Sequence, residues 1–319
     1  HNLKVGLSDE QAFNDESRMN NNQTDGLNYD FLNGKPNRIQ YFAGPFFQQE
    51  RQNHEIGLFA QDAWRIGRMT LNLGLRWDYV TMGFPSADLP AGQWVPARHV
   101  DAVSGVPQWS DINPRLGVSY DVFGNGRTAL KASIGRFNQL SRSDMTRRFH
   151  PFTSSISNAN RNWTDLNGNF IPDCDLKNFA AQDLSASGGD ICGQISNVNF
   201  GKFIPTATIF DDSVIKSNRD FLWDINVQFD HEIVHGLSVN AGYNHNWDGN
   251  FVIQENTLLG PNSFDEFCIT APTDPRLPTS GQQLCGYYDV KPTLFGLGTL
   301  RVTNSKEFGG QRRYWDGIV

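Results

Sequence analysis

The residues whose types and spacing come nearest to a catalytic site are His231, Glu232 and His235, which form a His-Glu-x-x-His pattern. On a helix this spacing lets both imidazoles bind one zinc ion while the glutamate activates water. Here the pattern ends at Gly236 and lies in an alternating apolar and polar stretch, which indicates a strand. At about 3.3 Å per residue the two histidines would lie about 13 Å apart. We therefore expect no zinc protease, and Glu255 is separated from the pattern by another alternating stretch.

A loop from Asp165 to Asp175 places oxygen-bearing residues at every second position around Gly168. This spacing is typical of the first part of a Ca²⁺-binding loop. The acidic residue expected at the twelfth position is missing, because Leu176 stands there. The alternative is a loop rich in Asx turns and fixed by Cys174. The candidate ligands of a structural Ca²⁺ are Asp165, Asn167, Asn169, the backbone carbonyl of Ile171, Asp173 and Asp175.

The four cysteines form two local pairs, Cys174 with Cys192 and Cys268 with Cys285, each in a polar segment. An even number of cysteines in such segments suggests disulfides and an oxidising compartment. Closing each loop would stabilise the fold by about 3 kcal/mol. The alternatives are free thiols in a cytosolic protein and a zinc site, and the absence of a Cys-x-x-Cys motif argues against zinc.

Other enzymatic motifs are absent from the sequence. It has no Gly-x-Ser-x-Gly motif, no phosphate-binding loop and no dinucleotide fingerprint. The carboxylate pairs Asp211-Asp212 and Asp265-Glu266 lie in expected loops, where a solvated surface is their ordinary role. The net charge is −7, and no Lys/Arg cluster alternates with aromatic residues. We expect no catalytic activity, no catalytic cofactor and no nucleic-acid partner.

The elements that position these residues are expected to be strands. The 319 residues include 30 Gly, 23 Phe, 8 Trp and 8 Tyr, a composition that favours strands and turns over helices. Alternating residues mark hairpins near 55–80, 113–137 and 222–248, each with strands of about a dozen residues around a short turn. In the last hairpin Trp223, Ile225 and Val227 share one face, and Asp224 and Asn226 share the other.

Long polar segments separate the hairpins, near residues 82–111, 139–218 and 252–292, and we expect them to be loops. Short turns on one side and long loops on the other are typical of outer-membrane barrels, with the turns periplasmic and the loops extracellular. A soluble sandwich would show the same alternation, but its strands cluster near five or six residues. Aromatic residues near the strand ends would fit a membrane-interface girdle: Trp64, Trp77, Tyr79, Trp223 and Trp247.

Three runs of residues resemble a known family. Residues 57–64 and 71–78 resemble the FxQDxW and LxLGLRxD strand pair of TonB-dependent receptors, and residues 111–121 resemble the strand that follows it. The acidic, cysteine-bearing loops, including residues 268–272, are most similar to the Oar-like branch. The resemblance covers nearly the whole chain, and the order of the motifs strengthens it.

The resemblance implies an all-β, antiparallel up-and-down barrel in the bacterial outer membrane, with about 22 strands in the whole family fold. It also implies a plug domain and a TonB complex that supplies energy. Members import iron chelates, cobalamin, glycans or peptides, and some Oar-like members are linked to adhesion or export. We expect residues 1–319 to be part of one barrel domain with about eight to ten strands. No plug, TonB box or C-terminal aromatic strand end is recognised, so we expect a partial or processed chain.

The expected function is that of a segment of a TonB-dependent receptor or transporter for an unidentified extracellular ligand. Outer-membrane lipid would contact the apolar faces, and the TonB complex would act through an N-terminal part that the sequence lacks. The first alternative is a structural or adhesive surface protein built on the same barrel. The second is a secreted, soluble β-sheet protein that binds glycans.

Overall fold

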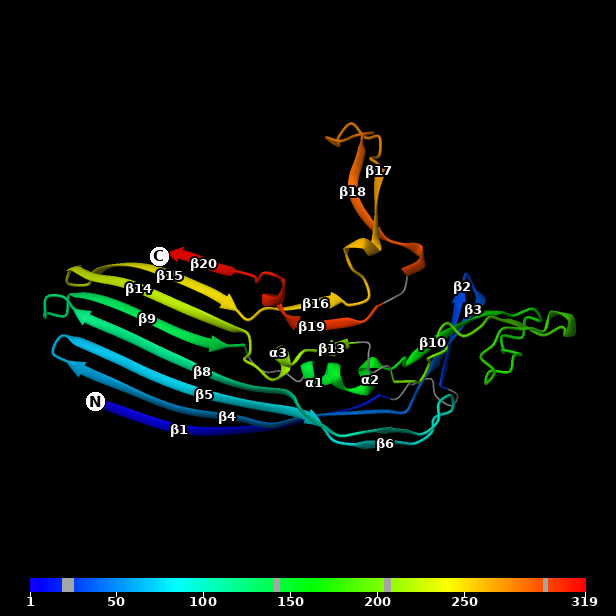
Figure 1. Cartoon of the computed structure of the whole chain (residues 1–319), viewed down its shortest axis with the longest axis horizontal. Helices are drawn as coiled ribbons and strands as arrows, with labels where there is room; N and C mark the ends of the chain where they lie inside the picture. Colours follow the sequence, from blue (N-terminus) through cyan, green and yellow to red (C-terminus); the bar gives the residue numbers. More distant parts are fainter. Residues whose placement is uncertain (19–25, 140–143, 204–207, 295–297) are drawn as a thin grey trace.

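The computed structural model describes residues 1–18, 26–139, 144–203, 208–294 and 298–319. One large antiparallel sheet dominates it, and the strands of this sheet follow one another in chain order (Figure 1). Its strands are β1 (Asn2–Arg18), β4 (Phe46–Ile66), β5 (Met69–Phe84), β8 (Val103–Asp121), β9 (Thr128–Asn138), β14 (Phe221–Val234), β15 (Leu237–Gly249) and β20 (Arg313–Ile318). The sheet is open, because β1 and β20 form its two edges in the described part of the chain.

The expected hairpins are present and are longer than the alternation indicated. β4 pairs with β5, β8 with β9 and β14 with β15. Their turns lie together at one end of the sheet, at the left of Figure 1. Gly67 and Gly236 have positive φ angles of 57° and 82° in these turns, a conformation that glycine adopts without strain. The tight turns therefore lead directly into strands of up to 21 residues.

The opposite end of the sheet carries smaller sheets and short helices. The outer cap is a sheet in the order β11-β12-β10-β3-β2, together with the connections between its strands. Its elements are β2 (Leu27–Leu32), β3 (Lys35–Phe42), β10 (Asn158–Thr164), β11 (Gln182–Asp183), η1 (Ser185–Ser187) and β12 (Ile191–Cys192).

The inner cap lies between the outer cap and the large sheet, and it combines two small sheets with three short helices (Figure 1). It contains β6 (Ala87–Leu89), β7 (Arg98–Val100), α1 (Asp144–Phe149), α2 (Pro151–Ser154), β13 (Thr208–Phe210), α3 (Asp212–Ile215), β16 (Val252–Asn256), β19 (Leu300–Asn304) and η4 (Ser305–Phe308). None of the helices in the described part of the chain is both long and apolar enough to cross a membrane.

A third feature is the arm, a two-stranded hairpin that projects away from the other elements (Figure 1). It consists of β17 (Phe264–Thr270) and β18 (Gln283–Val290), preceded by η2 (Pro261–Ser263) and followed by η3 (Pro292–Leu294). All the residues of β17 are exposed.

The expectation that residues 82–111, 139–218 and 252–292 are loops was wrong in detail, because each segment contains strands. For the first two segments the physical reason is that apolar residues scattered through them meet in two cores, whereas the strands of residues 252–292 form by backbone pairing, β16 with β19 and β17 with β18. One core, in the outer cap, surrounds Trp163 and Tyr41, and the other, in the inner cap, surrounds Phe84 and Phe152. No single segment has enough apolar residues in periodic order to show this, because the partners come from distant parts of the chain.

The large sheet has no packed core on its apolar face. Leu73, Leu116, Leu130 and Val227 are each exposed by more than 40 %. Monomeric soluble proteins rarely expose apolar surface on this scale. Polar exceptions lie toward the edges of this face, where Asp62 contacts His1 and Asp316 contacts His245 and Tyr243. The face suits contact with lipid, and β14, with 14 residues, is long enough to cross the hydrocarbon at a tilt.

Candidate functional site

The register of the large sheet aligns mostly polar and small residues in rows across one face, with Trp315 as the exception. One row contains Lys4, Gln61, Gly74, Arg115, Gly135, Asp224, Asn246 and Trp315. The next row toward the turns contains Asn2, Ala63, Asn72, Gly117, Ser133, Asn226, Asn244 and Gly317. Neither row contains Leu, Ile or Val. We call this surface the polar face.

An open groove of about 420 Å³ lies along the polar face over β1, β4, β5 and β8. Its lining includes Lys4, Phe59, Arg76 and Arg115. Gly6 has no side chain, and the Phe59 ring occupies the space that a side chain at this position would fill. We call this feature the cationic groove.

A buried polar network fastens the inner cap to the large sheet. The Asp111 side chain is fully buried, and its Oδ2 accepts a hydrogen bond from Arg219 Nε at 2.8 Å. Its Oδ1 accepts from the Arg219 backbone N–H and from Asn138 Nδ2, each at 3.2 Å. Arg136 Nη1 donates to Asn113 Oδ1 at 3.0 Å, and its Nη2 lies 3.5 Å from Asp111. The network joins β8 and β9 to the segment that enters β14.

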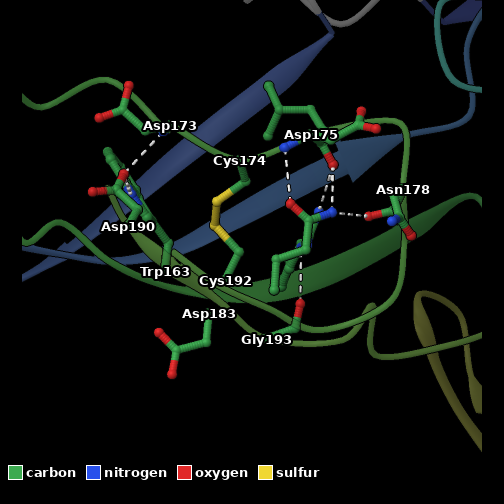
Figure 2. Close-up of a disulfide and its surroundings, with 12 residues drawn as sticks. Trp163, Asp173, Cys174, Asp175, Asn178, Asp183, Asp190, Cys192 and Gly193 are labelled. Atoms are coloured by element: carbon green, nitrogen blue, oxygen red, sulfur yellow. Dashed lines mark hydrogen bonds between the residues drawn. A yellow bond between two sulfur atoms is a disulfide. The ribbon is translucent and has the colours of Figure 1, made fainter. Parts of the chain in front are cut away.

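The outer cap is held by a disulfide and by two buried charged residues. Cys174 and Cys192 are bonded, as expected from their spacing (Figure 2). Asp190 is fully buried, and its carboxylate accepts from Trp163 Nε1 at 2.8 Å and from the backbone N–H of Asp173 at 3.0 Å. Arg161 is also buried, and its guanidinium donates to three backbone carbonyls of the surrounding loops. Side chains on both sides of the disulfide therefore fix the loop.

The loop that we considered for calcium uses most of its side-chain oxygens internally. Asp165 accepts from the backbone N–H groups of Gly168 and Phe170, at 2.7 and 2.9 Å. The other contacts are Asn167 Oδ1 with Asn169 N, Asn169 Oδ1 with Ile171 N, Asp173 Oδ2 with the amides of Asn167 and Asn169, and Asp175 Oδ1 with Lys177 N. Over the described residues, no group of three or more His, Cys, Asp or Glu is arranged to hold a metal ion. The geometry supports the Asx-turn alternative.

These turns present apolar side chains at the tip of the outer cap. Phe170, with a positive φ of 61°, and Ile171 are exposed by 58 % and 63 %. The Phe170 ring lies 6.2 Å from that of Phe31, which in turn lies 6.3 Å from Trp163. We call this surface the tip.

The residues of the His-Glu-x-x-His pattern lie on different elements. His231 and Glu232 belong to β14, where His231 Nδ1 shares a hydrogen bond of 2.9 Å with Thr128 Oγ1. His235 lies in the turn after β14 and is fully exposed. A strand and a turn thus replace the helix that zinc binding would need.

The arm contains the second expected disulfide, between Cys268 and Cys285. Its rings include Phe267 and Tyr287, which face each other across the strands with their centroids 5.7 Å apart. A two-stranded hairpin alone is marginally stable in water, so this disulfide adds a covalent link to the backbone pairing of the strands.

Burial lowers the pKa values of two titratable groups in the inner cap, His150 and Arg98. His150 is 1 % exposed between Phe84 and Phe152, and its Nδ1 accepts a hydrogen bond from the Phe152 backbone N–H at 3.3 Å. Burial lowers the pKa of His150 to about 4, which keeps the ring neutral at neutral pH. Arg98 lies over the Phe152 ring, and burial also lowers its pKa.

An antiparallel meander with one lipid-compatible face and one polar face is the wall of a membrane-spanning β-barrel. The chain belongs to the outer membrane β-barrel domain family, whose model matches residues 2–283. It is also similar to the TonB-dependent transporter Oar of Myxococcus xanthus, with 27 % identity over 207 residues. That match covers 63 % of this chain and 18 % of the relative. The chain is thus a bacterial outer-membrane protein, and the soluble, secreted alternative is wrong.

Sequence reasoning missed several of the residues described above. Arg161, Asp190 and Arg219 lie in polar segments, and nothing in their spacing marks them as buried. Lys4 and Arg115 could have been found, because both alternate with apolar residues on strands and therefore belong to a polar face. The row that joins them depends on register, which pairs strands that are distant in the sequence.

Proposed function

We propose that the chain forms part of the wall and the extracellular cap of a TonB-dependent transporter. The observation that carries this proposal is the polar face, which runs across every strand of the large sheet while the opposite face is apolar. A barrel wall of this kind offers a solute an aqueous path through the membrane. The named relative, a TonB-dependent transporter, supports the same class.

In this proposal the parts of the chain have separate roles. The apolar face contacts outer-membrane lipid, and the caps contact an extracellular ligand before it enters. The rigid outer cap suits recognition, because its disulfide, Arg161 and Asp190 hold the loop in one shape. The TonB complex supplies energy by engaging the protein outside these 319 residues. We propose no catalytic role for any residue.

Cysteine labelling of the full-length protein in living cells tests the proposal. The four cysteines of these 319 residues are in disulfides, so labelling above that of the full-length wild type reports the new thiol. We expect a charged, membrane-impermeant maleimide to label Asn226→Cys on the polar face and not Val227→Cys on the apolar face. Labelling of Asn226→Cys should fall at least threefold in cells that lack TonB. Equal labelling with and without TonB would exclude energised transport.

A specific observation favours one other function, which is adhesion. The tip exposes Phe31, Phe170 and Ile171 on the outer cap. The outer cap lies at the end of the molecule far from the turns (Figure 1). If adhesion is the main role, Phe31→Ser with Phe170→Ser should reduce attachment of cells to a hydrophobic surface severalfold. The same double variant should leave TonB-dependent labelling of Asn226→Cys unchanged.

A further inference from the structure

The cationic groove carries positive charge that its own residues do not neutralise. Lys4, Arg76 and Arg115 line it, and Asp62 is the single carboxylate among the described lining residues. Asp62 is already paired with His1 at 2.6 Å. Arg76 is paired with Asp78 at 2.7 Å. Among the described residues, neither Lys4 nor Arg115 has a carboxylate oxygen within 4 Å.

Two other cations on the polar face have carboxylate partners. Lys131 lies 2.9 Å from Asp230, and Arg313 lies 2.7 Å from Asp248. Arg115 instead rests its guanidinium over the Phe137 ring, 4.6 Å from the centroid. A cation held against an aromatic ring keeps its N–H groups available for an acceptor. The lack of a carboxylate partner thus distinguishes Lys4 and Arg115 from Lys131 and Arg313.

The geometry of the groove suits a ligand with more than one anionic group. Lys4 and Arg115 belong to the same row and are separated by Gln61 and Gly74. At about 4.8 Å between strands, their Cα atoms lie about 14 Å apart. Gly74 leaves the space between them open, and Phe59 offers a flat apolar wall. Two long cationic side chains can close on a compact polyanion from both sides.

We propose that the cationic groove binds a carboxylate- or phosphate-bearing group through Lys4 and Arg115. The inference rests on the proposed function, because a groove on the polar face is reached by solutes only if that face is wet. The same chemistry could come from a small polyanionic solute or from an acidic segment of the same protein. Charge-assisted hydrogen bonds to a planar guanidinium and an ammonium provide the recognition.

The test is calorimetric titration of the purified full-length protein, in detergent at low ionic strength, with citrate and with inorganic pyrophosphate. We expect binding that weakens about tenfold or more in Lys4→Gln and in Arg115→Gln, and that weakens further as NaCl is raised. Arg115→Lys keeps the charge but loses the planar guanidinium, and it should weaken binding less than Arg115→Gln does. Lys131→Gln, a matched change at a paired cation of the same face, should bind as the wild type does.

A second measurement separates the two sources of the anion. Lys4 is acetylated with a water-soluble amine reagent in the absence of added anion, and Lys177 in the outer cap serves as the accessible reference. If citrate does not bind but Lys4 is protected until 1 M NaCl is added, the anionic group belongs to the protein itself. If Lys4 reacts as fast as Lys177 and neither probe binds, the proposal is wrong.

Failure of the groove and failure of the proposed function give different results. A dry polar face would show as absent labelling of Asn226→Cys, whatever the titrations give. A wet polar face with no anion binding and a reactive Lys4 would overturn the groove proposal alone. Heat-modifiable migration on a gel confirms that each variant is folded before it is titrated.

Discussion

Asp111 shows how much depends on one buried carboxylate at the boundary between sheet and cap. It accepts hydrogen bonds from Arg219 and Asn138 and also lies near Arg136. Removing one partner from a buried ion pair is costly, because it leaves the other charge without compensation. The network therefore fixes where the inner cap leaves the sheet and where β14 begins.

We predict that Asp111→Asn destabilises the protein by about 3–5 kcal/mol, because it leaves Arg219 buried with its main counter-charge removed. The temperature at which the heat-modifiable band disappears measures the effect. Asp212→Asn is the matched control, since Asp212 pairs with Lys216 at an exposed site, and it should cost less than about 0.5 kcal/mol. Similar effects of the two changes would show that the network contributes no special stability.

Gly83 near the end of β5 is required by backbone contact. A Cβ at this position would lie 2.2 Å from the carbonyl oxygen of Val103, which is backbone and cannot move aside. We predict that Gly83→Ala costs about 1–3 kcal/mol, measured by the same thermal assay. Gly117→Ala is the control, because no heavy atom lies closer than 3.8 Å to the place where its methyl carbon would stand, and its stability should match that of the wild type.

At the scale of elements, the hairpins could be predicted and the caps could not. β14 and β15 alternate throughout, so local sequence specifies both strand and face. β1 alternates only over its first half, and its later residues are polar. It becomes a strand because β4 offers an edge along nearly its whole length. The outer cap depends on contacts such as that of Tyr41 Oη with the Leu176 carbonyl, 135 residues away, and no local pattern reports such a contact.

The candidate site, like the fold, could be predicted only in part. The two disulfides were predicted from spacing and are confirmed. The oxygen-rich loop was recognised from the sequence. Whether its side chains face a cation or the loop backbone depends on their rotamers, which the spacing of the residues does not specify. Arg161 and Asp190, which decide the shape of that loop, are isolated in the sequence.

The inner cap should lose stability in acid because of His150. Its folded-state pKa of about 4 lies below the ordinary value of 6.5. Between these values the unfolded chain binds a proton that the folded cap excludes, so stability falls as pH drops from 6.5 to 4, by up to about 1.4 kcal/mol per pH unit. Above pH 6.5 this residue causes no pH dependence. Proteolysis of the cap at pH 7 and pH 5 measures the difference.

His150→Phe should remove this acid sensitivity, because the replacement is apolar and cannot take up a proton. His235→Gln is the control, since His235 is fully exposed in a turn. Acid sensitivity that persists in His150→Phe would assign the effect to another group.

The disulfides should act on their own elements and not on the barrel wall. We predict that Cys174→Ser with Cys192→Ser lowers the stability of the outer cap by about 3 kcal/mol, seen as faster protease cleavage between residues 160 and 200. The heat-modifiable migration of the large sheet should be retained. Cys268→Ser with Cys285→Ser should affect only the arm. Loss of membrane assembly in either double variant would contradict this separation.

At the scale of the whole molecule, the two faces of the sheet predict opposite responses to charge. Val227→Arg should block assembly into the outer membrane, at a cost of about 2–4 kcal/mol if the residue lies near the membrane midplane. Asn226→Arg, one residue earlier on the polar face, should be tolerated. The yield of heat-modifiable protein in outer-membrane fractions measures both. Equal tolerance would contradict the assignment of the apolar face to lipid.

The pairing of β9 with β14 dictates an order of events during export. These strands are neighbours in the sheet, but the described residues of the chain between them, 144–203 and 208–220, lie with the caps at the end opposite the turns (Figure 1). In the proposed function the caps are extracellular, so the segment between β9 and β14 must have crossed to the cell exterior by the time these two strands pair. Cys174 and Cys192 both lie within it, so their bond can form in the periplasm beforehand and deliver the loop already closed. A protein domain inserted between β9 and β14 would have to pass through the barrel wall before these two strands pair.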